Sequence, residues 1–144
     1  MNRKQVFIAT VSAFLTLGIL VAFSRPTGGN VRSVECIARA TDLYTEEDIT
    51  AAFDTIKSEF TSGFKGCTLH ELRYDSEIEA QFLNETPGHR QEDAGNRIVV
   101  LSEFTTSWQA TGDGFSPNDR YEDWQWILTR PSKNAPWKVD GWGY

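Results

Sequence analysis

Residues 45–66, TEEDITAAFDTIKSEFTSGFKG, constrain the fold more strongly than any other stretch of the chain. Apolar side chains recur in it at intervals of four, three, four and four residues, at Ile49, Phe53, Ile56, Phe60 and Phe64. This spacing places them on one face of an α-helix. Thr45 precedes three acidic residues, as is typical of a helix start, and Gly63 and Gly66 end the run. The pattern predicts an amphipathic helix over residues 45–63 that packs on a sheet.

The sequence after this helix favours a strand, a second short helix and three further strands. Residues 67–75 alternate between apolar and polar, which predicts a strand, and residues 76–84 predict a helix capped by Ser76. Three later runs, joined by links of hairpin length, predict strands at residues 97–108, 121–130 and 137–144. Helices that precede a run of hairpin-linked strands indicate an antiparallel α+β domain.

The N-terminus is apolar and begins with basic residues. Arg3 and Lys4 precede residues 6–23, which carry no charge. As a helix this run is about 27 Å long, close to the roughly 30 Å thickness of the hydrocarbon core of a bilayer. Residues 1–25 therefore predict either a signal peptide or a membrane anchor.

The remaining chain divides into a linker over residues 26–35 and a single α+β domain over residues 36–144. Either interpretation of the N-terminus places this domain outside the cytoplasm, as a secreted protein or as the exposed part of a protein with one membrane-spanning helix.

Composition excludes several functional classes. The chain has 144 residues and a formal net charge of -6, which argues against a nucleic-acid binder because such proteins normally carry a basic face. Two His and two Cys are too few for a four-ligand zinc site with anything to spare. The sequence contains no Cys-x-x-Cys motif and no glycine-rich phosphate loop. We therefore expect no metal and no cofactor.

The two cysteines, Cys36 and Cys67, are both in the part of the chain expected to be exported. A disulfide between them is the natural expectation in an oxidising compartment. The alternative is a pair of unbonded thiols.

Aromatic residues are concentrated near the C-terminus. All five tryptophans fall within the last 37 residues, together with Tyr121 and Tyr144. Aromatic side chains at alternate strand positions can line a ligand site, or they can fill the core of a small sheet. If a surface of this domain binds a ligand, the candidate residues are Trp124, Trp126, Tyr121 and Trp108.

Several motifs resemble a family of small exported proteins of Gram-positive bacteria that is known mainly as a domain of unknown function. They are YTEEDI at residues 44–49, FKGCTL at 64–69, WQWIL at 124–128, WKV at 137–139 and WGY at 142–144. The resemblance implies a fold like nuclear transport factor 2, in which a curved antiparallel sheet wraps helices into a cone. It also implies a longer second helix, from which residues 86–89 depart. It implies no established activity, so the resemblance assigns no catalytic residue to this chain.

We expect a non-enzymatic binding or interaction domain that contacts a small apolar ligand, a sugar or a protein partner. An alternative is a small cone-shaped enzyme that acts on a hydrophobic substrate, with His70 and Asp75 as an acid–base pair. A structural accessory of a membrane complex, held by residues 6–23, is a third interpretation. A homodimer is a further expectation for such a fold.

Overall fold

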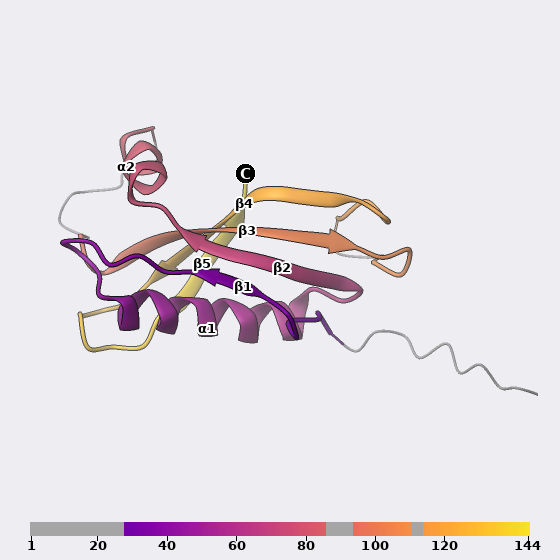
Figure 1. Cartoon of the computed structure of the whole chain (residues 1–144), viewed down its shortest axis with the longest axis horizontal. Coiled ribbons are helices and arrows are strands. Elements are labelled where there is room, and N and C mark those ends of the chain that lie inside the picture. Colours follow the sequence, from indigo (N-terminus) through magenta and orange to yellow (C-terminus); the bar gives the residue numbers. More distant parts are fainter. Residues whose placement is uncertain (1–27, 86–93, 111–113) are drawn as a thin grey trace, which may run out of the picture.

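The computed structural model describes residues 28–85, 94–110 and 114–144. In these ranges the elements are β1 (Glu35–Ile37), α1 (Glu46–Gly63), β2 (Cys67–Tyr74), α2 (Ser76–Glu85), β3 (Arg97–Thr106), β4 (Arg120–Thr129) and β5 (Lys138–Gly143). The strands form one sheet in the order β1-β2-β3-β4-β5. Helix α1 runs along one face of this sheet, and α2 follows the end of β2 (Figure 1). The expected α+β class is confirmed.

The sheet is mixed, so the expectation of a purely antiparallel sheet was wrong. The short strand β1 was not expected, and it pairs in parallel with β2. A parallel partner requires a crossover connection, and α1 supplies it, because the chain runs from β1 through α1 to β2. The other three strand pairs are antiparallel.

Helix α1 follows the predicted apolar pattern. Its buried face consists of Ile49, Ala52, Phe53, Ile56 and Phe60. Thr45 is its N-cap: the Thr45 hydroxyl accepts a hydrogen bond from the Asp48 amide at 3.1 Å, and the Asp48 carboxylate accepts one from the Thr45 amide at 3.1 Å. This reciprocal capping box satisfies two amides that would otherwise lack partners at the helix start. The prediction of a helix packed on a sheet is confirmed.

Each antiparallel strand pair contains one irregularity in its register. The extra residue lies in β2 between Leu69 and Glu71, in β4 between Tyr121 and Trp124, and in β5 between Val139 and Gly141. Bulges bend a sheet and increase its twist. Because there is one in every antiparallel pair, they favour a bent and twisted sheet.

Helix α2 is capped by Asp75, and the prediction of Ser76 as the cap was wrong. The Asp75 carboxylate accepts hydrogen bonds from the amides of Glu77 at 2.9 Å and Ile78 at 3.2 Å. A carboxylate one residue before the helix reaches these amides and also complements the positive end of the helix dipole.

Part of the expected linker packs against the fold. The Gly29 amide donates to the carbonyl of Thr61 at 3.1 Å, and the Asn30 amide donates to the carbonyl of Cys67 at 2.8 Å. A Cβ on Gly29 would collide with the backbone of Phe60. Glycine therefore serves here for close approach between backbones, and residues 29–35 lead directly into β1.

The structure does not join Cys36 to Cys67, which contradicts the expected disulfide. Cys36 pairs with Leu72 in the parallel register of β1 and β2. Leu72 lies five residues beyond Cys67, which corresponds to about 16 Å along an extended strand. A disulfide needs Cα atoms within about 7 Å of each other. Cys36 is exposed on β1, whereas Cys67 is buried at the start of β2.

The predicted signal peptide or membrane anchor, residues 1–25, lies outside the described residues. No helix in the described ranges is long and apolar enough to cross a bilayer. Residues 86–89, where the chain departs from the resembled family, also lie outside them.

Candidate functional site

Five aromatic side chains gather where β4 begins and β5 ends. We call this cluster the aromatic surface, and its members are Phe115, Tyr121, Trp124, Trp142 and Tyr144. Trp142 is 48% exposed and Tyr144 is 76% exposed, whereas the other three are partly buried. The ring of Trp142 lies 5.7 Å from that of Phe64, the residue at which α1 ends. The helix therefore stops beside the aromatic surface and does not cover it.

Ring contacts hold the aromatic surface in place. Tyr121 stacks on buried Phe104, with 4.8 Å between ring centroids. Trp124 stands at right angles to Tyr121, and its ring centroid is 5.1 Å from that of Tyr144. Offset and edge-to-face pairs of this kind each stabilise a fixed arrangement. These contacts therefore favour one arrangement of Tyr121, Trp124 and Tyr144.

The two tryptophans of β4 differ in how their indole N–H groups are satisfied. Trp126 Nε1 donates to the Ser102 hydroxyl at 2.8 Å. Trp124 Nε1 is also buried, yet no acceptor for it exists among the described residues. A buried donor without an acceptor costs roughly 1–3 kcal/mol. The aromatic surface therefore contains one buried polar group without a hydrogen bond among the described residues.

The structure places the four binding-site candidates from the sequence in three different environments. Trp124 and Tyr121 belong to the aromatic surface. Trp126 is fully buried and contacts Phe60 and Phe64 of the core, so it presents no atom to a ligand in this structure. Trp108 is 61% exposed in the turn that follows β3. Phe115, which the sequence reasoning missed, completes the surface from the loop before β4, where no strand periodicity marked it.

The structure does not bring His70 and Asp75 together. His70 lies at the irregularity of β2, and its Nε2 is 2.7 Å from the hydroxyl of Thr105. Asp75 follows the end of β2 and caps α2. Because of the bulge, Leu69, Leu72 and Tyr74 are buried on one face of β2, and His70 does not lie on that face.

A buried carboxylate in α2 was not singled out from the sequence. Glu79 is 3% exposed and accepts hydrogen bonds from the Tyr74 hydroxyl at 2.6 Å and the Val99 amide at 3.1 Å. Burial raises the pKa of Glu79 above its usual value, and burial also raises the pKa of Tyr74, with a further contribution from Glu79. The Val99 amide lies just beyond the end of the β2–β3 ladder, so Glu79 replaces the missing strand partner there.

A second buried polar group joins the start of α1 to the end of β4. Arg130, which follows β4, donates from one guanidinium nitrogen to the Asp48 carboxylate at 2.6 Å and from the other two to the Gly95 carbonyl. The same guanidinium lies 4.1 Å from the centre of the Trp137 ring. The hydrogen bond from Arg130 lowers the pKa of Asp48. Every polar contact of this cluster is internal, which identifies its role as structural.

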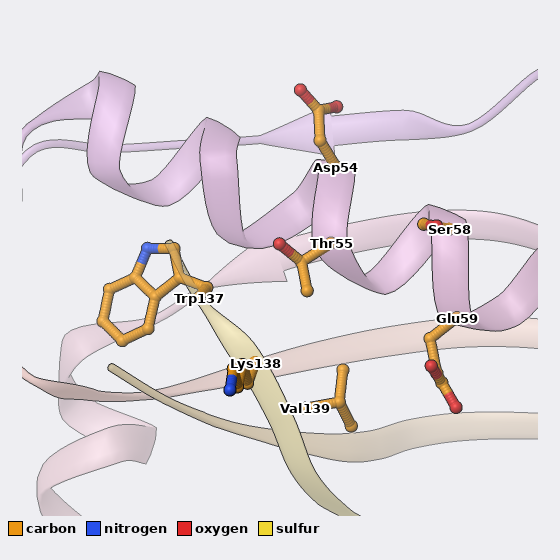
Figure 2. A pocket seen from close by; sticks show the side chains of 7 residues that line it. All are labelled: Asp54, Thr55, Ser58, Glu59, Trp137, Lys138 and Val139. Atoms are coloured by element: carbon orange, nitrogen blue, oxygen red, sulfur yellow. The ribbon is translucent and has the colours of Figure 1, made fainter. Parts of the chain in front are cut away.

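An open groove of about 560 Å³ lies between α1 and β5. It is lined by Asp54, Thr55, Ser58 and Glu59 of α1 and by Trp137, Lys138 and Val139, and Figure 2 shows that Thr55 and Glu59 point toward β5 whereas Asp54 points away from it. Within the described ranges, no group of three or more His, Cys, Asp or Glu side chains is placed to hold a metal.

The chain was compared with protein-family models, with curated proteins and with solved structures. Neither a family model, nor a curated protein, nor a solved structure matches the chain.

Proposed function

We propose that the chain is an exported or membrane-tethered, non-catalytic binding domain that contacts a small ligand or a protein partner through its aromatic surface. The observation that carries this proposal is the buried N–H of Trp124, which lacks an acceptor among the described residues. The ring that carries it contacts the rings of Tyr121 and of exposed Tyr144.

The side chains of the aromatic surface indicate what kind of ligand it would bind. Trp142 and Tyr144 expose large, flat apolar areas, which favour a ligand or partner with an apolar face. The buried indole N–H of Trp124 would be satisfied by a hydrogen-bond acceptor, such as a hydroxyl or carbonyl oxygen, on a ligand whose binding moves the neighbouring rings aside. Tryptophan and tyrosine are also the residues that most often dominate binding energy in protein interfaces. Aromatic side chains with few rotatable bonds lose little conformational entropy on binding, so less of their contact energy is offset.

We also propose that the domain has a cone-like fold similar to nuclear transport factor 2, in line with the motifs that resemble the exported Gram-positive family. Support comes from the curvature that three bulges give the sheet and from the packing of α1 inside that curve. In such a fold a ligand would enter at the open end of the curved sheet, and we infer that the aromatic surface faces that end.

Native mass spectrometry of the full chain, gently released from the cells that produce it, tests the binding function. We expect a species heavier than the chain that dissociates to the bare mass on activation. A double variant, Trp142→Ala with Tyr144→Ala, should lose most of this species, because it removes the exposed rings while leaving Trp126 in the core.

Leu43→Ala is the matched control, since Leu43 is 45% exposed on the segment before α1. This variant should retain the bound species. Equal retention by the double variant and by the control would contradict the proposed site. The mass difference also distinguishes a small ligand from a protein partner.

A further inference from the structure

Among the ten described residues of α2, only one side chain is buried, and it is a carboxylate. Glu79 is 3% exposed, whereas the apolar residues Phe82 and Leu83 are half-buried and Ile78 is exposed. Helix α1 differs, because all the residues that it buries are apolar. Buried apolar area is what normally holds a helix against a sheet. The attachment of α2 therefore depends strongly on Glu79.

The two carboxylate oxygens of Glu79 bind to two different strands. Oε2 accepts the hydrogen bond from the Tyr74 hydroxyl of β2, and Oε1 accepts the one from the Val99 amide of β3. Tyr74 and Val99 are themselves 5% and 2% exposed, so water does not reach these donors freely while α2 is docked. Movement of α2 away from the sheet would break both hydrogen bonds together.

No cation forms an ion pair with Glu79 in the part of the chain that the structure describes. The titratable groups that act on it are two tyrosines, Tyr74 of β2 and Tyr44 of the segment before α1. The arginines of β2, of β3 and of the residue after β4 pair with other carboxylates: Arg73 with Glu71 and Asp123, Arg97 with Asp140, and Arg130 with Asp48. An ionised Glu79 is therefore a buried charge without an opposite charge, which costs free energy.

Docking of α2 changes the proton equilibrium of Glu79. Burial raises the pKa of Glu79, and the hydrogen bonds from Tyr74, Val99 and Tyr44 offset only part of that rise. When α2 is undocked, the carboxyl group is in water and has its ordinary pKa of 4.5. Because the docked pKa is the higher one, the contribution of Glu79 to docking is fully present below pH 4.5 and is lost as the pH rises through the docked pKa. Docking is therefore weaker at neutral pH than at acidic pH.

We propose that α2 is a pH-sensitive flap, which docks firmly on β2 and β3 when Glu79 holds a proton and opens more often when Glu79 is ionised. A protonated Glu79 still accepts from the Val99 amide on one oxygen, and from the other it donates its proton to the Tyr74 hydroxyl. On opening, the carboxyl group enters water and releases that proton. The protein thus covers this end of β3 in acid and exposes it more often at neutral pH. This device does not depend on the function proposed for the aromatic surface.

Hydrogen exchange of the full chain, followed by nuclear magnetic resonance at acidic and at neutral pH, tests the proposal. Each measured rate is divided by the rate of an unstructured peptide at the same pH, which gives a protection factor for each amide. From about pH 5 to about pH 7.5, we expect the protection factors of the Val99 amide and of residues 80–85 to fall by at least about threefold, because their exchange reports opening of the helix. The amides of α1 are the internal reference and should not fall in parallel.

Glu79→Gln removes the titratable group and keeps the size of the side chain. In this variant the protection factors of Val99 and of residues 80–85 should be the same at both pH values. The matched control is Glu77→Gln, the same substitution at an exposed position of the same helix. It should show the full decrease of the natural chain, because the pKa of an exposed carboxyl group changes little when α2 opens.

Tyr74→Phe is a second variant, which decides the question even if Glu79→Gln does not dock α2. It keeps the ring that lies 5.5 Å from that of Tyr44 and removes only the hydroxyl that donates to Glu79. Because that hydrogen bond lowers the pKa of Glu79, its loss should move the midpoint of the pH dependence to higher pH. The amide signal of Val99, which is bonded to the carboxylate, follows this midpoint directly.

The proposal is overturned by any of three results. These are equal protection of Val99 and residues 80–85 at both pH values in the natural chain, an equal decrease in Glu79→Gln and Glu77→Gln, or a midpoint in Tyr74→Phe that stays in place or moves to lower pH. A decrease that α1 shares in full would also overturn it, because the whole domain and not the flap would then open.

Discussion

Trp126→Ala is expected to lower the free energy of unfolding by about 3–5 kcal/mol, the usual cost of removing a large aromatic side chain from a core. Trp126 is fully buried and lies between α1 and the sheet, in contact with Phe60 and Phe64. Its removal also leaves the Ser102 hydroxyl without the indole donor. Urea denaturation followed by circular dichroism measures the change.

Trp142→Ala is the natural comparison, because Trp142 is 48% exposed and contacts the ring of Trp126 from the outer side. Its loss should cost about 1–2 kcal/mol, in proportion to the apolar area that it buries. If the two variants were equally destabilised, the division of these tryptophans into core and surface would be incorrect.

Arg130→Met is expected to cost about 3 kcal/mol, since removing one partner of a buried ion pair leaves the other charge without compensation. Arg130 is 6% exposed and is the cation that pairs with Asp48 at the start of α1. The value is near the lower end of the range because Asp48 keeps its hydrogen bonds with Thr45. Methionine keeps an apolar side chain beside Trp137, and the change also removes the two hydrogen bonds that Arg130 donates to the Gly95 carbonyl.

The pH dependence of the same variant has a definite sign. The pKa of Asp48 is lowered in the folded protein, so its contribution to stability is fully present above the unfolded pKa of 3.8 and is lost as the pH falls through the folded pKa. Arg130→Met should therefore lose less stability than the natural chain on acidification below about pH 4. Lys57→Met, which removes only the exposed pair with Asp54, should leave both the stability and its acid dependence nearly unchanged.

The helices and long strands were predictable because their signals are local. Apolar residues at helical spacing and the capping pattern at Thr45 located α1 to within one residue at its start. Strand β1 has only three residues, too few for a periodic pattern, and its parallel pairing depends on a tertiary crossover. The disulfide was inferred from cysteine count alone, whereas its absence follows from the register that separates Cys36 from Cys67.

The candidate site was only partly predictable for a related reason. Strand alternation places Trp124 and Trp126 on the same face, and the sequence does not say which of them α1 covers. The helix ends at Gly63, so it buries Trp126 and leaves the area around Trp124 open. Likewise, a bulge at His70 shifts the alternation of buried and exposed side chains in β2 by one position, and the local sequence does not predict this bulge.

The indole N–H signals in a ¹H–¹⁵N nuclear magnetic resonance spectrum test the central claim most directly. The full chain as isolated from its producing cells would be compared with the same chain after unfolding, removal of bound molecules and refolding. We predict that the Trp124 Nε1–H signal moves downfield in the isolated form, because a bound acceptor hydrogen-bonds it, whereas the Trp126 signal stays in place. Identical Trp124 Nε1–H signals in both preparations, together with an unchanged signal from the Tyr144 backbone amide, would contradict the assignment of the aromatic surface as a binding site.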